Sequence, residues 1–171
     1  MYWMYEQLAG NTSALNARCL AAQAPGSEWL CFFAENISPY LTTPLFALQS
    51  YYDSYQILAI LHANATAPNA ADVNRYGGLL NAKVKSTLLA SSVKHGAALD
   101  ACEHHCGGRG EVWPALPVAK NTTRQNAAWA AWYGGGTALE EQVATFPCAW
   151  CCGAHVTGAR SAADVVRALL D

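Results

Sequence analysis

Charged residues are scarce in this sequence, and the few that occur nearly balance. Of the 171 residues 13% are charged, the net charge is -2, and the isoelectric point lies near 6.2. No basic excess is available for nucleic acid or an anionic membrane, and no run of like charge forms an interaction tail. Polar residues interrupt the apolar stretches well short of a bilayer span. We expect a soluble chain with one core and no nucleic-acid or membrane partner.

A secretory leader is missing from the first residues. Met1–Gly10 has no basic start, no continuous apolar segment and no small-residue cleavage site. Either a leader has been removed or the chain starts inside a longer protein, and we favour the second explanation.

Cysteines and glycosylation sequons, in contrast, are plentiful. Seven cysteines are many for a cytosolic protein of this size. They are Cys19, Cys31, Cys102, Cys106, Cys148, Cys151 and Cys152. Asn-x-Ser/Thr sequons, which are glycosylated in the secretory pathway, begin at Asn11, Asn36, Asn64 and Asn121. We expect a secreted glycoprotein with structural disulfides, in which Cys19 pairs with Cys31 across a small loop.

One apolar run organises the middle of the chain. Leu45–Leu48, opened by Pro44, predicts a buried strand, and Asp53 follows a few residues later. Open α/β sheets carry their functional loops at the C-terminal ends of such strands. The alternative is that Asp53 only caps a helix predicted over Ser54–His62.

The other expected elements alternate in the same way. Ala97–Cys102 is a weak strand candidate, directly followed by Glu103-His104-His105-Cys106. Apolar periodicity and capping residues predict the helices, which are Thr12–Gln23 capped by Asn11 or Thr12, Asn74–Val93, Thr122–Tyr133 and a tail helix from Ala162.

Along the chain the order is strand, acidic residue, helices, strand and then histidine. This is the second half of the α/β-hydrolase order, in which the triad runs Ser, Asp, His. That chemistry needs histidine as a general base for the weakly nucleophilic serine, and a carboxylate that orients the imidazole. No Gly-x-Ser-x-Gly occurs in these residues. We therefore expect the nucleophile to lie upstream of Met1.

The residues resemble the pectin acetylesterases of plants and their animal relatives, the Notum carboxylesterases. Leu30–Ile57 is similar to the family's stretch from a Cys-Phe-Phe start through "TPLF" to "YDSWQI", and Ala101–Cys106 is similar to the plant motif Ser-Cys-x-x-His-Cys. Family-like pieces follow at Trp113, Asn121, Trp129–Tyr133 and Phe146–Cys151. The resemblance covers most of the chain from Cys19 to Cys152.

The resemblance implies a fold and a site. The fold would be the C-terminal part of an α/β-hydrolase-like three-layer fold, with residues 1–171 as a single partial domain and 153–171 as a tail helix beyond the resemblance. The triad acid falls on Asp53 and the triad base on His105, with His104 as the alternative after a one-residue slip. Trp113, in a loop, is the candidate for a substrate-side aromatic. The family's nucleophile and oxyanion-hole motifs are absent, a cysteine pair between Asp53 and His105 is missing, and Tyr55 replaces a usual Trp.

The function implied is that of a secreted serine carboxylesterase that hydrolyses acetyl esters of cell-wall pectin. It would be a monomer acting on acetylated polysaccharide in the extracellular space or cell wall, with no metal or organic cofactor. Without its nucleophile the 171-residue piece would be inactive.

Other interpretations compete with this one. The chain could be a non-catalytic, disulfide-stabilised binding module derived from the same fold. The clustered cysteines and histidines, from Cys102 to Cys106 and from Cys148 to His155, could form a zinc site, although disulfides are the favoured fate of the cysteines. His105 could simply pack between disulfides. Trp129 and Trp132, three residues apart, are expected in the core and not on a sugar-binding surface.

Overall fold

The computed structural model describes residues 15–62, 67–105, 117–118, 123–148 and 150–152. The chain divides into two compact units, Met1–Leu45 with Lys83–His95 and Phe46–Ala82 with Gly96–Asp171. The prediction of a single partial domain therefore stays a prediction, and each unit is described by itself. No helix among the described residues combines the length and the apolar character that crossing a bilayer requires.

The second unit is built on a parallel sheet of three strands in the order β1-β2-β5. These are β1 (Phe46–Ser50), β2 (Gly96–Asp100) and β5 (Leu139–Glu141). Ser50 pairs with Asp100 at the C-terminal ends of β1 and β2. Every residue of the central strand β2 is buried. The apolar run therefore forms a strand that begins one residue later than predicted, but the predicted burial is wrong for most of it, since only Ser50 is buried and the other four residues are half-buried.

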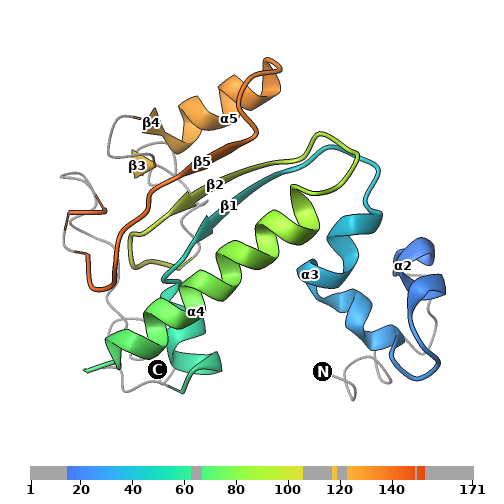
Figure 1. Cartoon of the computed structure of the whole chain (residues 1–171), viewed down its shortest axis with the longest axis horizontal. Coiled ribbons are helices and arrows are strands. Elements are labelled where there is room, and N and C mark those ends of the chain that lie inside the picture. Colours follow the sequence, from blue (N-terminus) through green and yellow to red (C-terminus); the bar gives the residue numbers. More distant parts are fainter. Residues whose placement is uncertain (1–14, 63–66, 106–116, 119–122, 149, 153–171) are drawn as a thin grey trace, which may run out of the picture. The chain divides into compact units, whose positions relative to one another are not determined.

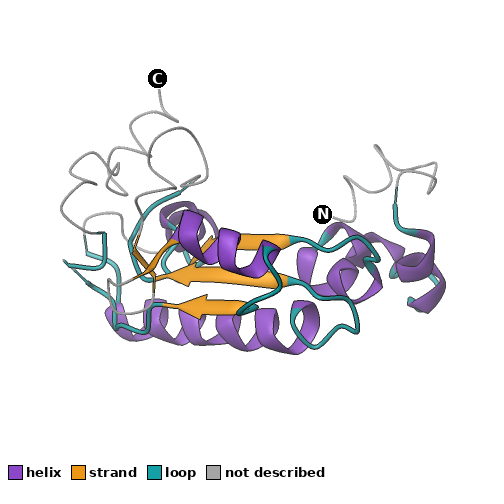
Figure 2. Ribbon diagram, turned by 90° about the horizontal axis from the view of Figure 1, so that it is seen from above, coloured by secondary structure: helices purple, strands orange, loops and turns teal. Residues whose placement is uncertain are grey.

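Helices cover both faces of this sheet, with α4 (Ala70–Lys83) on one side and α5 (Gln125–Tyr133) on the other (Figures 1 and 2). On the α5 side Ala128 packs with Ala98, Phe46 and Leu48. On the α4 side Gly77 lies so close to Tyr52 that a Cβ atom there would stand 2.9 Å from its ring. This layering agrees with the α/β class that was expected.

Asn74 of α4 ties the helix to the chain after β5. Its Oδ1 accepts hydrogen bonds from the Phe146 backbone N–H at 2.8 Å and from the Tyr52 hydroxyl at 2.9 Å. Its Nδ2 donates to the carbonyl oxygen of Phe146 at 3.0 Å. One amide side chain thus satisfies both backbone groups of Phe146, as buried backbone groups require.

Short elements complete the second unit. Gln56–Ile60 forms η4, a turn of π-helix after Asp53, and β3 (Pro117–Val118) pairs antiparallel with β4 (Thr123–Arg124).

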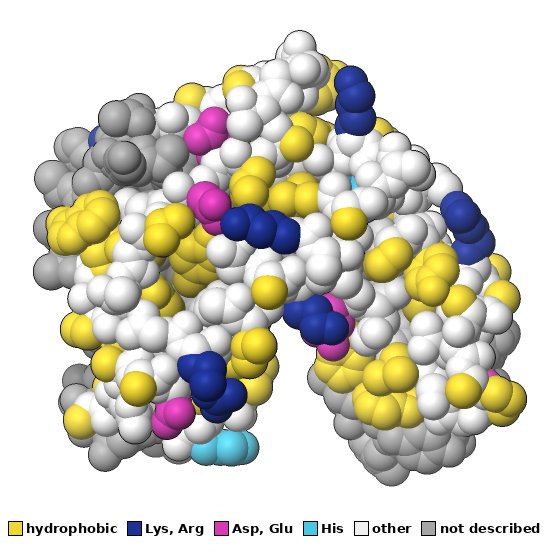
Figure 3. Space-filling view, viewed as in Figure 1, with side chains coloured by type: hydrophobic (Ala, Val, Ile, Leu, Met, Phe, Trp, Pro, Cys, Tyr) yellow, Lys and Arg dark blue, Asp and Glu magenta, His cyan; other side chains and the backbone are white. Residues whose placement is uncertain are grey.

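On the face shown in Figure 3, basic and acidic side chains are scattered among polar and apolar ones.

The described part of the first unit consists of short helices. They are α2 (Ala17–Ala22), η2 (Glu28–Phe32), α3 (Ala34–Ile37), η3 (Ser38–Tyr40) and η5 (Val84–Leu88). The Cys19–Cys31 disulfide joins α2 to η2 and confirms the predicted pair. The cap of α2 is Asn16, whose Oδ1 accepts from the backbone N–H groups of Arg18 and Cys19. The predicted cap at Asn11 or Thr12 is therefore wrong for this helix, because a nearer Asn supplies the same acceptor.

Two other helix boundaries differ from the sequence prediction. The helix expected over Asn74–Val93 begins four residues earlier, at Ala70, and passes into the π-helical turn η5 at Val84. The helix expected from Thr122 begins at Gln125, because Thr123 and Arg124 are paired as β4. The predicted tail helix lies outside the described residues.

Candidate active site

The candidate site lies where β1 and β2 end side by side. At the last residue of β1, Ser50 Oγ donates to the carbonyl oxygen of Cys102 at 2.6 Å and accepts from the N–H of Tyr52 at 2.9 Å. Asp53 and His104 then form an isolated parallel bridge, with the N–H of Ser54 donating to the His104 carbonyl at 3.1 Å. The backbone thus brings Asp53 into register with His104, which lies 51 residues later in the chain.

Asp53 and His105 face each other across this junction. Nδ1 of His105 lies 2.9 Å from Oδ2 and 3.1 Å from Oδ1 of Asp53. Asp53 is buried, whereas the His105 side chain keeps 38% of its surface exposed. Asp53 Oδ1 also accepts the N–H of Gln56 at 2.9 Å, at the start of the following helix. Asp53 therefore contacts the histidine and also accepts a hydrogen bond as a helix cap does, so the two interpretations of this residue are compatible.

The contact between Asp53 and Nδ1 of His105 leaves Nε2 as the ring nitrogen that could act as a general base. A carboxylate at Nδ1 favours the tautomer with its proton there, so that Nε2 carries the lone pair a general base uses. Tyr55 stacks on the imidazole with ring centroids 5.2 Å apart and an interplanar angle of 30°. The ring is thus held on one edge by Asp53 and on one face by Tyr55.

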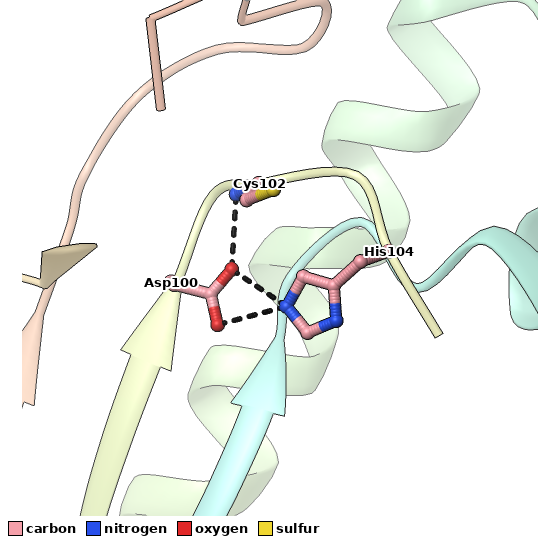
Figure 4. A group of neighbouring side chains, drawn as sticks. All are labelled: Asp100, Cys102 and His104. Atoms are coloured by element: carbon pink, nitrogen blue, oxygen red, sulfur yellow. Dashed lines mark hydrogen bonds and ion pairs between the residues drawn. The ribbon is translucent and has the colours of Figure 1, made fainter. Parts of the chain in front are cut away.

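His104 turns to a different carboxylate. Its Nε2 lies 3.0 Å and 3.1 Å from the two oxygens of Asp100, the last residue of β2 (Figure 4). Burial lowers the pKa of His104, but the hydrogen bond and charge of Asp100, together with the charge of Asp53, outweigh that effect. The pKa of His104 is therefore raised above its ordinary value. The two adjacent histidines thus contact different carboxylates, His104 that of Asp100 and His105 that of Asp53.

Asp100 is completely buried, and its carboxylate accepts several hydrogen bonds. Besides His104 it accepts from the N–H of Cys102 at 3.0 Å and from Nε2 of Gln125 at 2.9 Å. Neither Asp100 nor Gln125 was singled out from the sequence. The available signal for Asp100 was its place at the end of a predicted strand, whereas nothing in the helical pattern marks Gln125.

The ligand atoms of Asp100, Cys102 and His104 lie within 4.8 Å of one another, which is close enough for a metal ion. However, Cys102 is bonded to Cys152, and Cys148 to Cys151. Zinc binds thiolates, not disulfide sulfurs. The zinc interpretation is therefore wrong for these four cysteines, and structural disulfides are their observed state.

The remaining sequence candidates fall in several places. Asn36 is half-buried in α3. Trp129 is 43% exposed and stacks on Tyr133 at 5.3 Å, so its predicted core position is wrong. Trp132 does pack inward, against Phe46 at 5.2 Å. The others lie outside the described residues, namely Trp113, Cys106, Asn11, Asn64 and Asn121.

Fold and site together define an α/β protein with a carboxylate–histidine pair at the C-terminal ends of neighbouring parallel strands. The model of the family described as Pectinacetylesterase matches residues 1–155. The chain belongs to this family, as its motifs indicated.

Two curated relatives come from Arabidopsis thaliana. The chain is 27% identical to Pectin acetylesterase 11 over 141 residues, which cover 69% of this chain and 34% of the relative. It is 27% identical to Pectin acetylesterase 7 over 152 residues, which cover 78% and 38%. The chain thus spans about a third of the length of these relatives. No solved structure matches it.

Proposed function

We propose that this chain supplies the acid and the base of a serine carboxylesterase that hydrolyses acetyl esters of cell-wall pectin. The contact between Asp53 and Nδ1 of His105 is the observation that carries the proposal. The names of the two relatives support the ester and substrate class. Disulfides and sequons support an extracellular setting. The α/β-hydrolase-like arrangement of the complete enzyme is part of the same proposal.

The mechanism assigns one task to each group. A serine, supplied by a segment outside these 171 residues, attacks the ester carbonyl while Nε2 of His105 takes its proton. Asp53 holds the proton on Nδ1 and stabilises the imidazolium that forms. His105 then gives this proton to the departing sugar oxygen, which leaves as a hydroxyl, and next takes a proton from the water that cleaves the acetyl-serine ester and releases acetate. Oxyanion donors would come from the same outside segment, and no metal or organic cofactor takes part.

Variants of the full-length enzyme test the assignment. Asp53→Asn keeps a side-chain oxygen that can still cap the Gln56 N–H, since Asn caps helices as well as Asp does, but removes the charge that His105 uses. We expect it and His105→Gln to lower kcat for acetate release from acetylated pectin by about 10³- to 10⁴-fold. His62→Asn is the matched control, because His62 is exposed and has a positive φ of 50° that Asn tolerates.

Three results would contradict the proposal. The upstream transcript could lack an in-frame Gly-x-Ser-x-Gly segment, the full-length protein could release no acetate, or His105→Gln could keep full activity. Pectin binding without acetate release would favour the binding-module alternative.

A further inference from the structure

We infer that His104 is a positioning residue, which holds His105 in its productive orientation through a buried contact with Asp100. The catalytic consequence of this inference depends on the proposed function, whereas its structural consequence does not. His104 stands at a position that the plant motif Ser-Cys-x-x-His-Cys leaves open, so the contact is a feature of this chain's own sequence.

The first step of the argument is that Asp100 is a fixed anchor. It ends the fully buried strand β2 and is itself 0% exposed. Its carboxylate accepts from the Cys102 N–H and from Gln125 of α5, in addition to His104. A buried carboxylate with several charge-assisted or amide donors has little freedom to reorient. A side chain that binds it is therefore held in place.

The second step is that His104 is held at both its backbone and its side chain. The N–H of Ser54 donates to its carbonyl oxygen at 3.1 Å, which ties it to the segment that carries Asp53. Its imidazole, buried with the rest of the residue, reaches inward to Asp100 (Figure 4). These two attachments fix the position and rotation of this residue.

The third step is that neighbouring residues on an extended chain point to opposite sides. His104 is paired in a parallel bridge and points to Asp100, whereas His105 points to Asp53 and keeps an exposed surface. Because the two histidines share a peptide bond, releasing the imidazole of His104 removes one of the two attachments that fix the backbone aiming His105 at Asp53. The expected consequence is a loosened contact at Nδ1 of His105.

The tautomer of His105 reports this contact directly. We would record long-range proton–nitrogen NMR spectra of the 171-residue chain, with ring signals assigned by His104→Gln and His105→Gln. His105 should carry its proton on Nδ1 in the wild type. His104→Leu, which has no donor for Asp100, should shift His105 toward the Nε2–H form. His104→Gln, which keeps an N–H donor, should restore the wild-type tautomer at least in part, and His62→Asn should change nothing.

If His104→Leu does not fold, Asp100→Asn replaces it, because the neutral amide weakens the same contact without changing the size of the side chain. An unchanged Nδ1–H tautomer in a folded His104→Leu or Asp100→Asn chain would overturn the inference.

A kinetic measurement on the full-length enzyme adds a second readout. Misplacing a catalytic group lowers kcat while substrate binding is kept, so we expect His104→Leu to lower kcat by about 10- to 100-fold with little change in KM. Full activity in His105→Gln would refute the proposed function and leave the tautomer result standing. Lost activity in His105→Gln with full activity in His104→Leu would refute only the positioning role.

Discussion

At the residue scale, Tyr55 contacts the proposed base, His105, through its aromatic ring. Its ring stacks on His105 at 5.2 Å and is itself 42% exposed. Aromatic contacts of this kind contribute about 0.5–1.5 kcal/mol, so Tyr55→Ala should lower kcat of the full-length enzyme about two- to tenfold. Tyr55→Phe keeps the ring and should retain most of the activity in the acetate-release assay. Equal losses in both variants would show that the hydroxyl, not the stacked ring, matters.

The pH dependence of stability tests the second histidine. The pKa of His104 is raised in the folded chain by Asp100 and Asp53, whereas an unfolded histidine titrates near its ordinary value of about 6.5. The folded state therefore binds the proton more tightly, and the stabilisation is complete below about pH 6.5. It is lost as the pH rises through the raised folded value.

Urea unfolding of the wild type and of His104→Gln at several pH values checks this direction of the pH dependence. The difference in free energy of unfolding should be largest below about pH 6.5 and should shrink as the pH rises. Gln is the matched replacement because it keeps a side-chain donor but cannot be protonated. A difference that grows with pH would contradict the assignment of a raised pKa to His104.

The residues of the site were only partly accessible from the sequence. The resemblance placed the acid at Asp53 and the base at His105, with His104 as the alternative after a one-residue slip. That alternative mattered because neighbouring positions on an extended segment occupy opposite faces. The structure brings His105 to Asp53 and His104 to Asp100. Gln125 gave no local signal, because its role depends on α5 packing beside β2.

At the element scale, Gly96 of β2 lies in a tight contact with Trp132 of α5. A Cβ atom there would lie 2.5 Å from Cδ2 of Phe46 and 2.6 Å from Cδ1 of Trp132. Overpacking of this kind costs about 1–3 kcal/mol, more than Ala gains over Gly in a strand, so Gly96→Ala should lower the free energy of unfolding.

Gly78→Ala is the control for Gly96→Ala. Gly78 is exposed in α4, and a Cβ atom there meets nothing within 4 Å. Ala should stabilise this helix by about 0.5–1 kcal/mol. Chemical denaturation of both variants should thus give opposite signs, and two stabilising substitutions would contradict the tight packing at Gly96.

Elements were easier to predict than their ends. The apolar run at Leu45–Leu48 and the strand candidate Ala97–Cys102 reappear as β1, which is mostly half-buried, and β2, which is buried throughout, because short apolar runs are a local signal for strands. The start of α4 and the exposed position of Trp129 were not predictable in the same way. They depend on which side of each helix the sheet covers, and three-residue spacing alone does not specify that.

At the scale of the whole molecule, the two units carry separate disulfides. Cys19–Cys31 closes 12 residues in the first unit, and Cys102–Cys152 closes 50 residues in the second. Loop-closure entropy assigns about 3 kcal/mol to the shorter loop and about 4 kcal/mol to the longer one. Two compact units need not unfold in one step, so each disulfide is expected to protect its own unit.

Hydrogen exchange on two matched double variants tests this separation. Cys102→Ala with Cys152→Ala should speed exchange in β1 and β2 by up to about a thousandfold, since each 1.4 kcal/mol is a factor of ten. The amides of α2 and η2 should change little. Cys19→Ala with Cys31→Ala should give the reverse pattern, with the sheet still protected. The Cys102–Cys152 variant should also weaken the contact between Asp53 and His105, because Cys102 lies three residues before His105. Equal loss of protection in both units from either variant would instead mean that the chain opens as one cooperative body.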